Sequence, residues 1–270
     1  MSTPFDEAAQ VLRSARRLIV FTGAGVSAES GIPTFRDDDG YWREFPPEPF
    51  ARWKGILRTA AFQPSRLAEF LLKVIGPIAT ARPNAAHRAI ESLEKSVSTI
   101  VITQNVDGLH QEAGSTTVWE IHGTFFEIVT LRGRFVRLLS RRELLHASEK
   151  VRRAERGLFK RTRLAWAVRH FFGLSWSGLR RPKLVLFGDQ MAEPDWSRAQ
   201  VDAAECDVML VVGTSAQVWP AATLRLMARD RGARIIEVSP DEPAFGGIWL
   251  QGPAADVLPR IVQNAFPNDS

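Results

Sequence analysis

Short apolar runs recur along the chain, and each run is followed by glycine or by small polar residues. The runs are rich in Val, Ile and Leu and are continuous rather than alternating, which is typical of strands buried on both faces of a sheet. Segments with helical periodicity separate most of them. The pattern predicts strands at 18–23, 99–105, 183–188, 208–213 and 234–239, and helices near 5–16, 64–75, 85–96, 219–230 and 253–265.

The alternation of strands and helices predicts an α/β fold with a Rossmann-like, doubly wound, mostly parallel sheet. Two stretches depart from it. Residues 36–63 are rich in proline, aromatic and charged residues and predict a long loop with short helices, and residues 140–172 predict one or two basic helices. We therefore expect a large domain at 1–125 and 184–270, which includes a loop and helical segment at about 36–80, and a smaller, mostly helical domain inserted at 126–183.

The composition is that of an ordinary globular protein, with 270 residues of which 45% are hydrophobic and 24% charged. No apolar run approaches the roughly 20 residues that a membrane-spanning helix needs. The first ten residues are acidic and lack the apolar centre of a signal peptide, so we expect a cytoplasmic protein without a membrane partner. A single cysteine, Cys206, excludes a disulfide framework and a cysteine-based zinc site.

Charge is distributed unevenly along the chain. The formal net charge is +5, but residues 127–183 alone carry +12 and the rest of the chain carries −7. Basic helices are usually only solvated faces, yet this excess is larger than solubility requires. A nucleic acid or an acidic partner for the 127–183 insert is therefore one hypothesis, and a merely solvated surface is the other.

The first predicted strand runs into the sequence GAGVSAESGIPTFR at residues 23–36. Gly23, Gly25 and Ala28 have the spacing of a dinucleotide-binding turn, in which glycines let the backbone approach a pyrophosphate at a helix N-terminus. Glycine-rich turns between strand and helix are common, and no clear acidic residue follows on a second strand. The turn alone leaves a nucleotide site and a plain structural turn open.

Three further motifs follow strand ends. They are TQNVDGLH at 103–110, WEIHG at 119–123 and GTSAQVWPAA at 213–222. Polar residues at the carboxyl edge of a parallel sheet are placed to face a ligand, but each motif has a structural alternative. Asn and Asp are good turn formers, a lone histidine is more often structural than catalytic, and small polar residues cap helices.

These motifs, together with PNAAH at 83–87 and FGD at 187–189, occur in the order in which they occur in sirtuins, and the chain resembles that family. Sirtuins are NAD-dependent protein lysine deacylases. The resemblance covers about 1–125 and 183–265, nearly everything outside the basic insert. It implies an NAD-binding domain at 1–125 and 184–270, a cofactor loop within 36–80, and an acyl-lysine protein or peptide as substrate.

The resemblance also implies roles for individual residues. The first turn would bind the pyrophosphate, the residues after the second strand would contact ribose and nicotinamide, and the strand ends beyond residue 210 would hold the adenosine half. The cofactor-binding residues are then Gly23, Ala24, Gly25, Ser27, Phe35, Arg36, Gln104, Asn105, Asp107, Gly213, Thr214, Ser215 and Ser239, the last standing where the family often has Asn. An extended substrate peptide would pair with Phe187, Gly188, Asp189, Gln190 and Met191.

His122 would be the general base, and Asn105 would assist catalysis in the nicotinamide pocket. Loss of nicotinamide leaves a reactive ribose carbon that the acyl-lysine oxygen can capture in a water-poor pocket. The resulting imidate needs a ribose hydroxyl to lose its proton near neutral pH, and an imidazole with a pKa of about 6.5 suits that step. For the remaining histidines we expect packing roles or solvent exposure; they are His87, His110, His146 and His170.

The chain departs from the family in its insert. Sirtuins typically carry four cysteines there that bind a structural zinc, and this chain has none, so we predict a zinc-free enzyme. Apolar residues could form a core in place of the metal: Leu144, Leu145, Leu158, Phe159, Leu164, Trp166, Phe171, Phe172 and Trp176. At the positions where the succinyl-removing branch has Tyr and Arg, this chain has Leu71 and Val74, which disfavours acidic acyl groups and favours acetyl or longer apolar ones.

Two other activities stay open. NAD hydrolysis or protein ADP-ribosylation would keep the first half of the chemistry and let water or a protein nucleophile capture the ribose. The peptide-pairing stretch and the presence of His122 favour deacylation. A binding function of the basic insert would be an accessory to either.

Overall fold

The computed structural model describes residues 3–34, 45, 47–155, 162–164, 173–175, 178–215, 217–243 and 246–267. The chain forms two compact units, described separately below. The parallel-sheet unit comprises Met1–Gly31, Arg82–Ile121 and Ala192–Ser270, and the antiparallel-sheet unit comprises Ile32–Ala81 and His122–Met191. The segment before residue 82 thus groups with the insert, whereas the sequence pattern assigned most of it to the large domain.

Six parallel strands form the sheet of the first unit, in the order β10-β9-β8-β1-β2-β3. From the central β1 the chain moves outward through β2 and β3, and it then returns to the other side of β1 for the remaining strands. This is the strand order of a doubly wound Rossmann sheet, as the sequence predicts. The strands are β1 (Arg17–Thr22), β2 (Ser98–Thr103), β3 (Val118–Glu120), β8 (Val208–Val212), β9 (Arg234–Ser239) and β10 (Ile248–Gln251).

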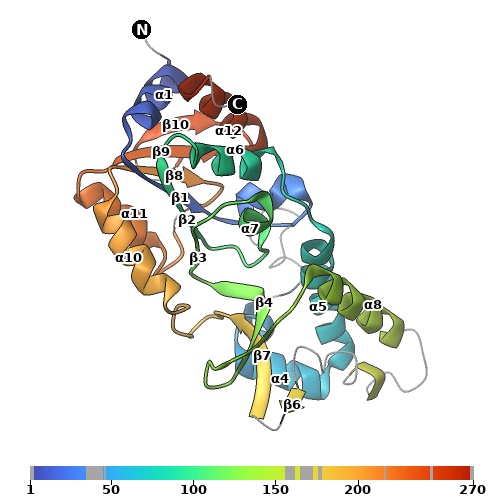
Figure 1. Cartoon of the computed structure of the whole chain (residues 1–270). Coiled ribbons are helices and arrows are strands. Elements are labelled where there is room, and N and C mark those ends of the chain that lie inside the picture. Colours follow the sequence, from blue (N-terminus) through green and yellow to red (C-terminus); the bar gives the residue numbers. More distant parts are fainter. Residues whose placement is uncertain are drawn as a thin grey trace. The chain divides into compact units, whose positions relative to one another are not determined.

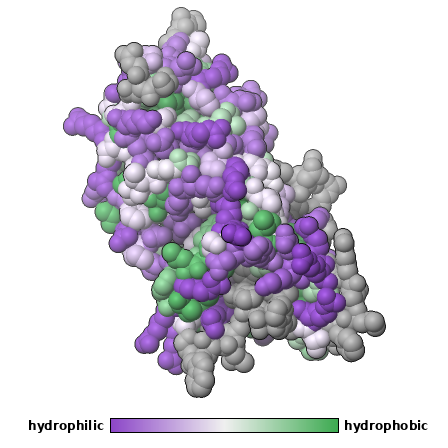
Figure 2. All heavy atoms as spheres, turned by 45° about the vertical axis from the view of Figure 1, so that its right-hand side comes forward, coloured by the Kyte–Doolittle hydropathy of each residue, from purple (hydrophilic) through white to green (hydrophobic). Residues whose placement is uncertain are grey.

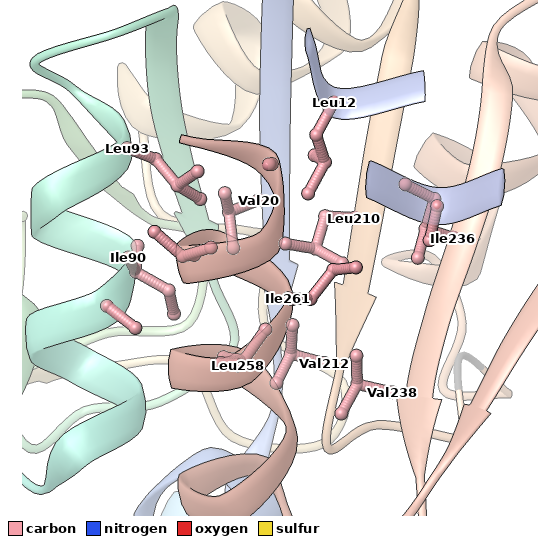
Figure 3. Packing of buried hydrophobic residues seen from close by; sticks show 14 of the residues in the cluster. Leu12, Val20, Ile90, Leu93, Leu210, Val212, Ile236, Val238, Leu258 and Ile261 are labelled. Carbon is pink, nitrogen blue, oxygen red and sulfur yellow. The ribbon is translucent and has the colours of Figure 1, made fainter. Parts of the chain in front are cut away.

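Helices cover both faces of this sheet (Figure 1). One layer consists of α1 (Pro4–Ser14), α6 (Ala85–Leu93) and α12 (Ala254–Ala265), and the other of α10 (Asp195–Glu205) and α11 (Ala222–Asp230). Leu258 and Ile261 of α12 belong to one buried cluster with Val20 of β1 and Leu210 of β8, and Ile261 lies beside Leu210 (Figure 3). Burying a side chain of this size stabilises the fold by about 1.5–3 kcal/mol. Because a helix layer covers each face of the sheet, both faces of its strands are buried and the strands are continuously apolar.

The antiparallel-sheet unit contains a four-stranded sheet in the order β5-β4-β7-β6, which the sequence analysis did not foresee. Its strands are β4 (Gly123–Thr130), β5 (Phe135–Leu138), β6 (Gly173–Ser175) and β7 (Gly178–Leu184). The prediction of a buried parallel strand at 183–188 is wrong, because β7 ends at Leu184 and pairs antiparallel with β4. A continuous apolar run shows that a segment is buried but does not say in which sheet it pairs.

Helices complete this unit: α3 (Pro47–Phe50), α4 (Trp53–Phe62), α5 (Pro64–Thr80) and α8 (Arg141–Glu155). Helix α8 packs on α5, and Ala68, Val151, Ala154 and Leu164 form a small buried cluster there. Of the apolar residues proposed to replace a zinc core, Leu144 and Leu164 are buried and Leu145 is half-buried. The other six lie outside the described residues.

The surface seen in Figure 2 is mainly hydrophilic, with apolar side chains exposed in places. Within the described segments, no helix has both the length and the apolar character needed to cross a membrane.

Candidate active site

Two glycine turns meet at the carboxyl edge of the parallel sheet, where the strand order reverses between β1 and β8. The Gly23 N–H donates to the carbonyl of Val212 (3.1 Å), and the Gly25 N–H donates to the carbonyl of Gly213 (2.8 Å). The crevice outside this reversal point is where doubly wound sheets bind ligands. The motifs at 23–36 and 213–222 are therefore joined, as a ligand site at the edge of the sheet requires.

The closeness of the two turns explains their glycines. A Cβ atom at Gly25 would lie 2.8 Å from the Cα of Gly213, and one at Gly213 would lie 2.4 Å from the backbone nitrogen of Val26. Gly213 also has a φ of +57°, in the left-handed region that favours glycine. From the sequence we expected glycines here because a ligand approaches the backbone. The close contact between the two turns is a second reason for these glycines.

Residues 24–30 form a short 3-10 helix, η1 (Ala24–Ser30). The N–H groups of Gly23, Gly25 and Val26 are donated to protein carbonyls. The Ala24 N–H has no acceptor within the part of the chain that the structure describes, so it is the amide in this turn left for a ligand. Phe35 and Arg36, expected in the loop that follows, lie outside the described residues.

A buried polar network lies behind the first turn. The Asn105 side-chain amide donates to the Gly23 carbonyl and to Ser27 Oγ, both at 3.1 Å. Ser27 Oγ in turn donates to Asp107 Oδ2 at 2.8 Å, and Asp107 Oδ1 accepts from the Leu109 N–H at 3.0 Å. All three side chains are buried, so the structure brings Ser27, Asn105 and Asp107 together as one rigid group.

The remaining predicted cofactor residues of this unit lie along the same edge. Gln104 follows β2, and its side-chain amide donates to Thr214 Oγ1 at 2.8 Å, which links the second motif to the fourth. Ser215 is exposed. Ser239 ends β9 and is half-buried, and its hydroxyl donates to the Asp241 carbonyl at 2.6 Å, within its own turn.

Two buried histidines lie beside the end of β1 and were expected only to pack. The His110 Nε2 lies 3.0 Å from Thr22 Oγ1, and the rings of His110 and His87 are 4.9 Å apart. His87 also completes the N-terminal cap of α6 with Asn84. Burial is the main cause that lowers the pKa of His87 to about 4 and that of His110 to about 3.

His122 belongs to the antiparallel-sheet unit, directly before β4, and is half-buried. Its carbonyl accepts a hydrogen bond from the Val185 N–H at 2.9 Å. Gly123 has a φ of +75°, and a Cβ atom there would lie 1.9 Å from the Lys183 carbonyl oxygen. The glycine of the HG motif is therefore needed for β4 to approach β7, which fixes the backbone of His122.

The predicted peptide-binding residues begin just after β7. Leu186 to Asp189 form a β-turn in which the Asp189 N–H donates to the Leu186 carbonyl at 2.9 Å. Gly188 has a φ of +93°, which the third position of a type II turn requires. Phe187, Gly188, Asp189 and Gln190 are exposed, and Met191 is half-buried.

The comparisons with known proteins give the chain's family. The family model for the Sir2 family matches residues 23–220. The NAD-dependent protein deacylase of Desulfosudis oleivorans is 39% identical over 267 residues, which is 97% of this chain and 96% of that protein. The chain belongs to the Sir2 family.

Solved structures of Sir2 proteins share this fold. The crystal structure of a Sir2 homologue in complex with NAD has a TM-score of 0.77 and 30% identity, and covers 98% of this chain and 95% of that one. A Sir2 structure bound to a myristoylated histone peptide has a TM-score of 0.70 and 29% identity, and covers 99% and 98%. The Rossmann-like fold and the family expected from the motifs are confirmed.

The described residues of this Sir2 protein contain no recognisable metal site. No group of three His, Cys, Asp or Glu side chains is placed to hold an ion among the described residues. Cys206 is buried, its Sγ donates to the Ala203 carbonyl, and burial raises the pKa of its thiol to about 11. The absence of zinc stays a prediction.

Sequence reasoning missed one group near the predicted peptide-binding residues 187–191. The Trp53 indole N–H donates to Asp189 Oδ2 at 2.7 Å, and the Arg181 guanidinium lies 4.7 Å from the Trp53 ring centroid. Trp53 begins α4, in the stretch at 36–63 that was expected to be a long loop with short helices. No local signal marks it, because its partner lies 136 positions further along the chain.

Proposed function

We propose that the meeting point of the two glycine turns binds the pyrophosphate and adenosine of NAD and that His122 is the catalytic base. Membership of the Sir2 family defines the activity and the cofactor: the chain is an NAD-dependent protein deacylase. The observation that carries the assignment of residues is the joining of three sequence motifs, at 23–36, 103–110 and 213–222, at one edge of the sheet through backbone and side-chain hydrogen bonds.

The polar groups of this edge suit the parts of NAD. Gly23 and Gly25 leave the backbone on either side of Ala24 bare of side chains, and the Ala24 N–H would donate to a phosphate oxygen. Thr214, Ser215 and Ser239 contact the adenosine half, and Gln104 contacts the nicotinamide ribose. Phe35 and Arg36, which lie outside the described residues, would cover that ribose. When bound, NAD supplies a ribose carbon whose nicotinamide substituent is a good leaving group.

Asn105 and Asp107 form the nicotinamide pocket, with Ser27 holding both in position. An amide and a carboxylate complement the carboxamide of nicotinamide, because the Asn105 carbonyl oxygen and the Asp107 carboxylate can each accept from its NH₂ group. The three residues need no rearrangement to bind it, since their hydrogen bonds to one another are already made. Preorganised polar groups of this kind lower the barrier to a step that develops charge.

His122 takes a proton from a ribose hydroxyl at its imidazole nitrogen. The Gly123 contact with Lys183 and the hydrogen bond from Val185 fix its backbone, so that only the side-chain torsions position the ring. A base held in place in this way is suited to proton transfer in the transition state.

The substrate is an acyl-lysine in an extended peptide that adds main-chain hydrogen bonds along residues 187–191. Leu71 and Val74 lie buried on α5, where an acidic acyl group would have no partner. The Sir2 relative bound to a myristoylated peptide supports a preference for apolar acyl groups over succinyl. The products are nicotinamide, the deacylated lysine peptide and an acyl-ADP-ribose, and one water is consumed when the lysine amine leaves.

NAD hydrolysis and ADP-ribosylation are the competing activities of the same edge. The test incubates the protein with NAD and an acetyl-lysine peptide and counts deacylated peptide against NAD consumed. The proposal is supported if the amount of deacylated peptide equals the amount of NAD consumed and if no peptide is deacylated without NAD. Consumption of NAD at the same rate with and without the peptide contradicts it.

We also propose that the enzyme is cytoplasmic and zinc-free. Cys206, the only cysteine, lies in the parallel-sheet unit, away in sequence from the insert where a zinc ribbon would stand. Chelators should leave the melting temperature and activity unchanged. One equivalent of zinc in the purified protein would overturn the zinc-free proposal.

We propose as an accessory function that the 127–183 insert binds a nucleic acid or an acidic partner. Its ion pairs among the described residues are internal, and they join Arg137 to Glu143, Arg153 to Glu149 and Lys183 to Glu127. Exposed arginines without an acidic partner in the described segments are Arg132, Arg134, Arg142 and Arg152. Guanidinium groups bind phosphate in a bidentate geometry.

The test of this accessory function is a titration with duplex DNA, single-stranded RNA and an acidic peptide at about 50 and 200 mM salt. Binding that weakens steeply with salt, and is lost when Arg152, Arg153 and Arg156 are replaced by Ala, supports it. No binding at the lower salt contradicts it.

A further inference from the structure

We infer that Trp53 and Asp189 are positioning residues for the substrate peptide: they hold the turn at 186–189 in the shape that pairs with the peptide main chain. The inference deepens the proposed function and rests on residues 187–191 being the peptide-binding segment. It assigns a substrate-related role to α4, which none of the sequence motifs contains.

Asp189 is the centre of the arrangement. Its Oδ2 accepts from the Trp53 indole N–H at 2.7 Å and from the Leu186 N–H at 3.1 Å. The same residue closes the turn with its own N–H. One carboxylate therefore joins both ends of the turn to helix α4.

A second contact beside Asp189 ties the turn to the same helix region. The Phe187 N–H donates to the Ala51 carbonyl at 2.8 Å. Two points of the turn are thus hydrogen-bonded to residues 51–53, which fixes the geometry of this exposed segment.

Arg181 packs against the face of the Trp53 indole. Its guanidinium lies over the Trp53 ring and donates to the carbonyls of Pro182 and Leu184 at 3.2 and 3.0 Å. A cation over an aromatic face is attractive, and the bonds to the end of β7 fix the cation. Burial lowers the pKa of Arg181, and the charge of Asp189 acts in the opposite direction.

The hydrogen bonds that hold the turn at 186–189 determine which of its backbone N–H groups remain available to a substrate peptide. The N–H groups of Leu186, Phe187 and Asp189 are donated within the protein. Those of Gly188, Gln190 and Met191 have no acceptor among the residues that the structure describes. Amides open on an exposed segment are what a peptide needs in order to add main-chain hydrogen bonds.

The chain contains a chemically matched arrangement in its other unit. The Trp119 indole N–H donates to Asp202 Oδ2 at 2.7 Å, and the Arg198 guanidinium lies 4.9 Å from the Trp119 ring centroid. Replacing either Trp by Phe removes the same hydrogen bond and keeps an aromatic ring under the arginine. Trp119→Phe is therefore a control for general loss of stability.

The experiment measures steady-state kinetics of Trp53→Phe with an acetyl-lysine peptide and with a blocked single acetyl-lysine that has no flanking residues. We expect the KM for the peptide to rise about threefold to tenfold, the range that corresponds to loss of one net hydrogen bond. The KM for NAD and the kcat at saturating peptide should stay within about twofold, and the single acetyl-lysine should react as with the wild type. Trp119→Phe should leave the KM for the peptide unchanged.

Asp189 gives a second, independent variant, since it is exposed and its replacement should not prevent folding. Asp189→Ala should raise the KM for the peptide as Trp53→Phe does, and Asp189→Asn, which keeps an acceptor oxygen, should restore much of it. An unchanged KM for the peptide in both Trp53→Phe and Asp189→Ala, or an equal loss with the single acetyl-lysine, would overturn the inference. A wild type that does not deacylate the peptide would instead overturn the proposed function.

Discussion

Ser27 Oγ donates a 2.8 Å hydrogen bond to Asp107 Oδ2, although the two residues are 80 positions apart in the chain and follow different strands. Both side chains are buried, and Ser27 also accepts from the Asn105 amide. The bond couples the glycine turn after β1 to the polar residues after β2. It makes one preorganised site from two sequence motifs.

Ser27→Ala should weaken NAD binding about tenfold or more, because a hydrogen bond to a charged group contributes about 1.5–3 kcal/mol and its loss leaves a buried carboxylate short of a donor. Titration calorimetry with NAD measures the effect. Ser148→Ala is the matched control, since Ser148 is also buried and donates to the Leu145 carbonyl at 2.7 Å. Equal NAD affinities for the two variants would refute the role of Ser27.

His122→Ala should abolish deacylation and leave the affinity for NAD within about threefold, because the imidazole acts as a base after NAD has bound. Peptide deacylation and NAD titration are measured on the same preparation. His146→Ala, which changes an exposed histidine of α8, is the control and should retain activity. Full turnover by His122→Ala would remove this residue from the mechanism.

Gly123→Ala and Gly133→Ala differ only in their surroundings, since both glycines have a φ of +75°. At Gly133 an added Cβ meets nothing within 4 Å, so the left-handed backbone alone should cost about 1–2 kcal/mol. At Gly123 the Cβ would lie 1.9 Å from the Lys183 carbonyl oxygen. Chemical denaturation should show a much larger loss for Gly123→Ala, with loss of activity; equal losses would contradict the account of the HG motif.

Stability should fall on acidification because of His87 and His110. Their folded-state pKa values of about 4 and about 3 lie below the usual value of 6.5, since burial disfavours the charged ring. Below pH 6.5 the unfolded chain takes up protons that the folded chain does not, so the free energy of unfolding decreases as the pH falls towards 4 and is unaffected by these groups above 6.5. The slope is at most about 1.4 kcal/mol per pH unit for each histidine.

Urea unfolding of the wild type and His110→Gln between pH 4.5 and 7 tests this linkage. Glutamine does not titrate and can still hydrogen bond to Thr22, so the variant should show a distinctly shallower dependence on pH. Parallel curves for the two proteins would show that His110 titrates normally in the folded state.

The parallel sheet could be predicted from the sequence because its strands are covered on both faces and are therefore continuously apolar. Strand β10 was missed, and β3 was expected only as a strand end at WEIHG, since three or four residues with Trp and Glu or Gln give too short a signal. In the insert, arginine-rich strands such as β7, with the sequence GLRRPKL, lack the alternation that marks a half-buried sheet.

The candidate site was predictable where a motif follows a strand end, because parallel strands bring their carboxyl ends to one edge. The placement of Asn105, Asp107 and Gly213 at that edge could be predicted in this way, and their roles stay a proposal. The bond between Ser27 and Asp107 could not be foreseen, since it depends on the register between two strands. The contact between Trp53 and Asp189 depends on the tertiary packing of α4, which no local pattern encodes.

The mass of the acyl product tests the central claim most directly. The protein is incubated with NAD and an acetyl-lysine peptide, and the products are analysed by mass spectrometry. The account predicts that nicotinamide, deacetylated peptide and O-acetyl-ADP-ribose appear in equal amounts, because the acyl group is transferred to the ribose. Free ADP-ribose with an unchanged peptide, or a peptide whose mass has increased by one ADP-ribosyl group, would contradict it.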